Sequence, residues 1–182
     1  QDDGYPQFLS NTKGAYGWNQ AVRAEFDASR VFSANPGAAG DWRRLGFGAV
    51  STIQRDGIIR GTSALVLLGD GREHEMVLRD RSAAHYSFDK GSSTQDYPSS
   101  LMGAIALLRQ SFYDAQWYKT YSAQPVSARA GSLEFNHSME AITRNLNLPQ
   151  IFDAGDKLNI LRVAALGREF NMSFIIRGNG NE

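Results

Sequence analysis

The side chains that could carry out chemistry are few and scattered in this sequence. Cysteine is absent from the 182 residues, which excludes disulfides, thiolate catalysis and cysteine-ligated zinc or iron–sulfur sites. Three histidines remain. His74 lies between Glu73 and Glu75 beside a predicted turn. His137 follows Asn136 in a polar stretch, and we interpret both histidines as solvent-exposed.

His85 and Asp153 are the two candidates for catalytic groups. His85 follows two alanines at the expected end of a strand, and Asp153 directly follows a short apolar strand pattern. Barrel enzymes place catalytic groups at such strand ends, and a histidine there can ligate a metal or act as a base. Because the sequence shows no partner ligands, it favours a hydrogen-bonded structural role for His85. Asp156 is interpreted as the N-cap of the following helix.

Other motifs carry less chemistry. The run Lys90–Thr94 has the composition of a phosphate-binding loop, but it lacks the required order of glycines and lysine. A Ser-His-Asp triad has no nucleophile elbow to support it. The aromatic residues between Phe112 and Tyr121 could line a ligand groove, although their helical spacing favours a place in the core or an interface.

Composition narrows the classes of partner. Basic and acidic side chains number 19 each, so no net charge attracts the protein to nucleic acid or an anionic membrane. The longest apolar stretch, around Ser63–Gly69, is too short to cross a bilayer. We therefore expect neither nucleic acid nor membrane insertion. The absence of cysteine is compatible with export, so we expect a periplasmic or otherwise exported protein, with a cytoplasmic location as the alternative.

The first half of the chain is expected to be irregular and then rich in hairpins. Residues 1–16 are polar and irregular, and a loose apolar pattern predicts a helix over 18–32. Asn35-Pro36-Gly37 breaks the chain before a short helix over 39–45. Two hairpins follow near residues 47–80, with turns marked by glycine and aspartate.

The second half alternates helices and strands. Helices are predicted over 101–119, 133–146 and 156–170, and strands over 148–152 and 172–176. A strand, helix and strand in this order form a right-handed crossover between parallel strands. The last third is therefore expected to be a segment of parallel sheet.

The order and spacing of these elements resemble the amidohydrolase superfamily, in particular imidazolonepropionase-like members. The stretches that carry the resemblance are Asn35-Pro36 with Trp42–Val50, Gly57–Val66, Met76–Asp80, Leu101–Gln110 and Ile151–Ile176. The resemblance implies an α/β fold, a partial TIM-type (β/α) barrel with a hairpin-rich insertion near residues 47–80. Residues 1–34 would form an irregular lead-in and helix, and residues 35–182 the partial barrel segment.

The resemblance also implies a metal-dependent chemistry that this segment lacks. The family holds one or two divalent ions with histidines and an aspartate at strand ends, and the metal activates a water for hydrolysis of C–N bonds. The matching positions here are Phe152 and Gly178, whose side chains cannot ligate metal. The resemblance implies a degenerate site without metal or cofactor, with a zinc-type divalent metal elsewhere in the parent protein. His85 stands roughly where relatives carry a lysine.

Two functions remain open. The first is a non-catalytic, structural segment of an amidohydrolase-like protein that hydrolyses amide or cyclic amide bonds. The alternative is a binding module for carbohydrate or peptide that uses exposed aromatic residues. The strand over 172–176 would leave an apolar edge, with Arg177 as the nearby charge that could guard it. Because both ends, Gln1 and Glu182, look cut, the expected partner is the rest of a parent chain or a tightly bound protein.

Overall fold

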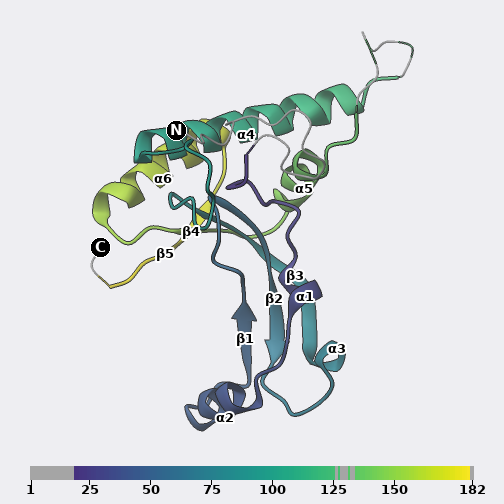
Figure 1. Cartoon of the computed structure of the whole chain (residues 1–182), viewed down its shortest axis with the longest axis vertical. Coiled ribbons are helices and arrows are strands. Elements are labelled where there is room, and N and C mark those ends of the chain that lie inside the picture. The colour runs from purple at the N-terminus through teal and green to yellow at the C-terminus, as the bar shows by residue number, and fades with distance from the viewer. Residues whose placement is uncertain (1–18, 126, 128–130, 132–133, 181–182) are drawn as a thin grey trace, which may run out of the picture.

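The computed structural model describes residues 19–180 except 126, 128–130, 132 and 133. Within these residues the chain forms a curled, mixed five-stranded sheet with six helices, consistent with part of a barrel wall (Figure 1). The irregular lead-in predicted over 1–16 lies outside the described residues, as do the predicted helix starts at Trp18 and Leu133.

The sheet joins an antiparallel half to a parallel half. Its strands lie in the order of the sequence. They are β1 (Ala49–Thr52), β2 (Ile59–Leu67), β3 (Val77–Ser87), β4 (Gln150–Asp153) and β5 (Phe174–Arg177). The pairs β1–β2 and β2–β3 are antiparallel, whereas β3–β4 and β4–β5 are parallel. The predicted hairpins and the predicted parallel crossover are therefore both present, and β3 belongs to each half.

The helices divide between two regions of the molecule (Figure 1). Their bounds are α1 (Ala28–Val31), α2 (Pro36–Arg44), α3 (Glu73–Met76), α4 (Leu101–Ser122), α5 (His137–Asn145) and α6 (Lys157–Phe170). The three long ones, α4 to α6, lie at the end that holds the parallel strands, and α2 and α3 lie at the far end of the antiparallel arm. Across the described part of the chain, no helix has the length and apolar character needed to span a bilayer.

The helix predicted over 18–32 is reduced to α1, because the preceding backbone bonds to β2 instead. The Arg23 N–H donates to the Ile59 carbonyl at 2.8 Å, and the Ile58 N–H donates to the Ala21 carbonyl at 2.8 Å. Gly57 has a φ of 91°, and a Cβ there would lie 2.8 Å from the Ala21 carbonyl oxygen. Only glycine tolerates both the positive φ and this close approach.

Two local structures differ from the sequence prediction. Asn35 does not simply break the chain: its side chain accepts a hydrogen bond from the Ala38 N–H at 3.0 Å, and Pro36 is the first residue of α2. This arrangement is favourable because proline at the first helical position loses no helical hydrogen bond. The second predicted hairpin closes through the short helix α3 rather than through a tight turn alone.

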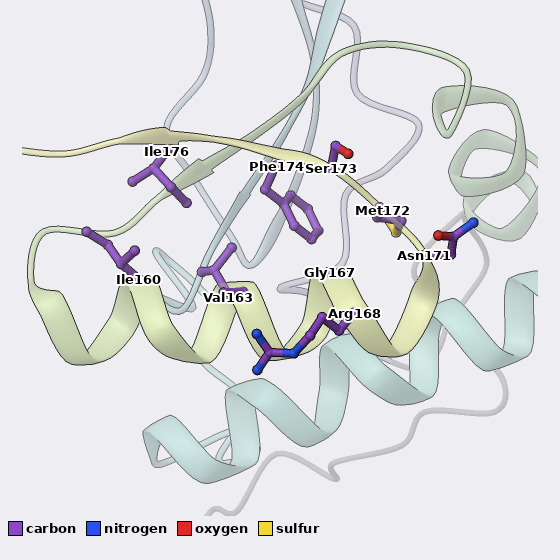
Figure 2. Close-up of a pocket in the computed structure, with 10 residues that line it drawn as sticks. Ile160, Val163, Gly167, Arg168, Asn171, Met172, Ser173, Phe174 and Ile176 are labelled. Carbon is purple, nitrogen blue, oxygen red and sulfur yellow. The ribbon is translucent and has the colours of Figure 1, made fainter.

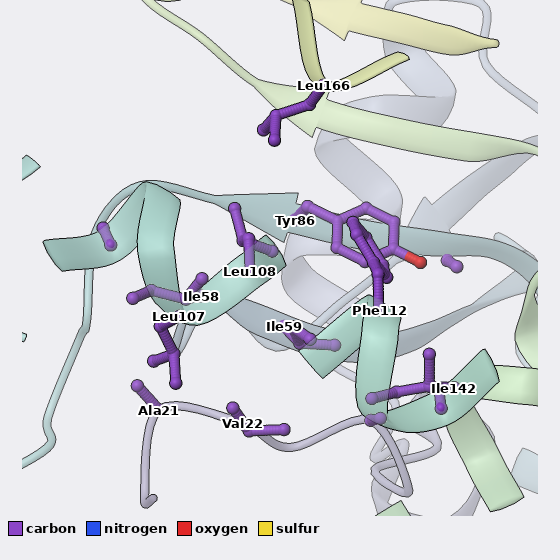
Figure 3. Close-up of a cluster of buried hydrophobic side chains, with 14 of the residues drawn as sticks. Ala21, Val22, Ile58, Ile59, Tyr86, Leu107, Leu108, Phe112, Ile142 and Leu166 are labelled. Atoms are coloured by element: carbon purple, nitrogen blue, oxygen red, sulfur yellow. The ribbon is translucent and has the colours of Figure 1, made fainter. Parts of the chain in front are cut away.

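The main core lies between the parallel strands and the long helices (Figure 3). Tyr86 of β3 and Phe152 of β4 are buried and stacked, with ring centroids 6.2 Å apart. Phe112 from α4 and Leu166 from α6 cover them. Because side chains alternate along a strand, the neighbours of these core residues point to the opposite face of the sheet.

Candidate functional site

The strand register brings polar side chains together on the face opposite the helices. His85 lies beside Ile151, and two residues further along Asp153 lies beside Arg177. These positions alternate with the core residues Tyr86 and Phe152, so they share the other face. Because β3, β4 and β5 are parallel, their carboxyl ends meet at one rim. Arg60 of β2 reaches the same place, and we call Arg60, His85, Asp153 and Arg177 the rim cluster.

Asp153 is held between two arginines. Arg60 and Arg177 both donate to its Oδ2 atom, and Arg60 Nε also donates to the Gly57 carbonyl at 3.0 Å. The Arg60 side chain is only 7% exposed. The second oxygen, Oδ1, is buried and has no hydrogen-bond partner within the described part of the chain. The carboxylate is thus fixed in place by one oxygen only.

His85 is 4% exposed and shares a hydrogen bond between Nε2 and Ser63 Oγ at 2.9 Å. Its Nδ1 atom is buried without a partner among the described residues. Burial lowers the pKa of the imidazole to about 4, and the charge of Arg177 acts in the same direction. Asp153 opposes this shift of the pKa, while Arg60 adds to it. The ring is therefore neutral at pH 7, and it takes part in a hydrogen bond, the part of the favoured interpretation that concerns its contacts.

The rim cluster does not fit a divalent cation. Over the described ranges, no three histidine or carboxylate side chains converge as metal ligands would. Phe152 lies in the helix-covered core and Gly178 follows β5. The residue that ends β4 on the rim face is therefore Asp153, and its two arginines would repel a metal ion.

The structure gives two arginines of the rim cluster roles that the sequence analysis did not predict. Arg177 does not guard the edge of the sheet, because its guanidinium is turned inward to Asp153. Arg60 was missed altogether, although an arginine beside Gly61 within an apolar run is the kind of signal that marks a buried charge. Arg60 is 93 residues away from Asp153 in sequence, so spacing alone could not reveal that the two side chains meet.

The remaining candidates lie outside the rim cluster. His74 in α3 and His137 at the start of α5 are exposed, as expected. The aromatic run on α4 splits: Phe112 is buried, whereas Trp117 is exposed and stacks on Tyr121 with ring centroids 5.1 Å apart. Core packing therefore explains only part of the run.

A second feature is the open edge at β5. The Ala154 N–H donates to the Arg177 carbonyl at 3.1 Å, so the backbone groups of Arg177 and Ile175 point toward β4. Those of Phe174 and Ile176 point the other way, and no described residue bonds to them. The Ile175 side chain is 56% exposed. An unpaired strand with apolar side chains is a site for pairing with another strand.

Hollows flank this strand. One of about 410 Å³ lies between α6 and β5, where Ile160, Val163 and Phe174 project into the space between helix and strand (Figure 2). Another of about 540 Å³ is lined by Phe170 and Ile175, together with residues from the approach to β4. We call the first hollow the edge groove. Both hollows are mainly apolar, so further protein could pack against either side of β5.

Comparison with known proteins finds a solved structure with a similar fold but no match to the sequence. No family model matches the sequence, and no curated protein matches it. The structure is similar to the crystal structure of an amidohydrolase from Thermotoga maritima MSB8, with a TM-score of 0.69 and 19% sequence identity. The match covers 95% of this chain and 49% of that one, so the chain spans about half the length of that protein. At this identity the likeness shows the fold alone.

Proposed function

We propose that this chain is a structural, non-catalytic segment of an amidohydrolase-like protein, in which it supplies part of a TIM-type barrel wall. The whole protein would hydrolyse C–N bonds of amides or cyclic amides, with a divalent metal held by residues outside this segment. The observation that carries the proposal is the outer edge of β5, which pairs with β4 on one side and with no described strand on the other, at the end of a curled sheet.

Parallel strands support the proposal because they are found with both faces covered. In β5, Ile176 packs against the helix-covered core, while Ile175 on the other face is exposed. The edge groove leaves the flank of α6 open as well. A following strand and helix would cover the outer edge of β5, the face of Ile175 and the flank of α6. The likeness to about half of a larger amidohydrolase supports such a continuation.

The rim cluster supports the non-catalytic part of the proposal. Metal-dependent hydrolysis needs several ligands that converge on one ion. Asp153 is instead neutralised by Arg60 and Arg177, and His85 bonds to Ser63. We infer that these groups serve structure or binding rather than activation of water.

Hydrogen exchange at single-residue resolution tests the proposal. The isolated 182-residue chain would be compared with the protein purified under native conditions from its source. We expect the outward-facing amides of Phe174 and Ile176 to exchange at least about tenfold more slowly in the native material, because a neighbouring strand would bond to them.

The inward-facing amides of Ile175 and Arg177 serve as the matched control. They point toward β4 in the chain alone, so their exchange should differ little between the two samples. Equal exchange of Phe174 and Ile176 in both samples would contradict the proposal.

A further inference from the structure

We propose that the rim cluster binds a small carboxylate that also carries a neutral hydrogen-bond donor, a hydroxyl or an amide N–H. This is a binding role beyond the structural one, and it does not depend on whether β5 pairs with another strand. Arg60, His85, Asp153 and Arg177 would each contact the ligand or orient a group that does.

The first step concerns charge. Two guanidinium groups share a single carboxylate oxygen of Asp153, which leaves an excess of positive charge on this face. Arg55 adds a further positive charge near His85. Asp56 also lies within electrostatic range of Arg60, but its carboxylate is occupied by an ion pair elsewhere. An excess charge beside a buried arginine is costly unless an anion offsets it.

The second step concerns the donors that remain. Arg177 uses Nη2 to reach Asp153, and its other side-chain nitrogens bond to no described residue. Its side chain is 32% exposed, so an incoming ligand can reach it. The planar guanidinium presents paired N–H groups that match the two oxygens of a carboxylate. Arg177 therefore provides the place for the carboxylate of the ligand.

The third step concerns the two buried atoms without partners. Buried polar atoms are nearly always hydrogen-bonded, yet Asp153 Oδ1 and His85 Nδ1 lack partners among the described residues. The ionised Asp153 can only accept, so a ligand that bonds to Oδ1 would supply the donor. A charged ammonium group would meet the repulsion of both arginines, which favours a neutral hydroxyl or amide. The neutral ring of His85 can take either tautomer to suit the ligand.

Glycolate and acetate form a matched pair of probes, because they differ by one hydroxyl group. The readout is the NMR signal of the His85 ring during titration at pH 6.5 in a buffer free of carboxylate and phosphate. Ligands with so few non-hydrogen atoms, at about 1.5 kcal/mol or less for each, bind at best in about the micromolar range, so the titration extends well into the millimolar range. We expect a saturable shift with both probes, and about tenfold tighter binding of glycolate, the gain from one hydrogen bond to a charged group.

Three variants test whether the ligand binds through the charges of the rim cluster. Arg177→Gln should abolish the saturable shift, while Arg79→Gln, at an exposed arginine on the same strand as His85, should leave it unchanged. Asp153→Asn removes the competing negative charge, so acetate should bind more tightly and the preference for glycolate should shrink. Amide spectra would confirm that each variant is folded. The proposal fails if neither probe saturates, if acetate equals glycolate, or if a folded Asp153→Asn protein loses acetate binding.

Discussion

At the scale of single residues, the least ordinary side chain is a buried histidine surrounded by cations. Ser63 of β2 holds its Nε2 atom, and the charges of Arg55, Arg60 and Arg177 oppose protonation while Asp153 favours it. A proton added to His85 would join an existing excess of positive charge in a poorly solvated place. The folded protein therefore keeps this ring neutral over a pH range in which an unfolded chain would not.

The prediction at this scale is that His85 makes the free energy of unfolding depend on pH. Its pKa is about 4 in the folded chain, against about 6.5 when unfolded. Between these values only the unfolded state takes up the proton, so stability is complete above about pH 6.5 and is lost as the pH falls toward 4. Urea unfolding at pH 7 and pH 4.5 should show that the protein loses about 2 kcal/mol more than its His85→Gln variant.

The variant also provides the control, because carboxylates elsewhere titrate equally in both proteins and cancel in the difference. If the two proteins lost the same free energy of unfolding between pH 7 and pH 4.5, the histidine would have an ordinary pKa. The neighbouring arginines would then be better solvated than their burial indicates.

At the scale of elements, particular residues fix both ends of α6. Asp156 caps its first turn by accepting a hydrogen bond from the Asn159 N–H at 2.9 Å. Asn171 ends it in the left-handed conformation, with a φ of 52°. Gly167 lets the chain turn back closely, since a Cβ there would lie 2.7 Å from the Met172 carbonyl oxygen. These local features place β5 beside α6 and so shape the edge groove.

The prediction for this element concerns the cap. Asp156→Ala should lower the free energy of unfolding by about 1 kcal/mol, because it removes both the hydrogen bond and a negative charge at the helix N-terminus. Asp156→Ser should recover most of that loss, since serine also caps. Thermal or urea unfolding of the three proteins measures the effect. A serine variant as unstable as the alanine variant would show that the cap contributes little.

At the scale of the whole molecule, the sheet is open on its parallel side. β3 and β4 each have a neighbour on both sides, whereas β5 has only β4. The antiparallel arm extends away from this half and carries exposed apolar residues such as Trp42 and Leu78. Under the proposed role, further protein would cover these described surfaces.

The prediction for the molecule is the absence of a bound metal. Because the rim cluster is cationic, the purified chain should hold no stoichiometric zinc, manganese or iron after dialysis. Elemental analysis of the protein measures this directly. The prediction is wrong if the chain holds about one metal ion and the His85→Ala variant loses it. His85 and nearby carboxylates would then bind a metal despite the positive charges of Arg60 and Arg177.

The sequence by itself was sufficient wherever neighbours along the chain determine the structure. Asp156 lies at the start of its helix as predicted, and the parallel pairing of β4 with β5 follows from the helix between them. A hydrogen bond three residues along the chain sets the cap, and the length of the connecting helix sets the crossover, so spacing reveals both.

Only the tertiary structure decided the rim cluster and the path of the first segment. Arg60 and Arg177 meet Asp153 across three different strands, and residues before α1 bond to β2 instead of forming the predicted helix. Those contacts depend on strand register, and a shift of one residue would turn Asp153 into the core and Phe152 to the rim. Register is set by the packing of the whole core around Tyr86 and Phe152, which no local pattern contains.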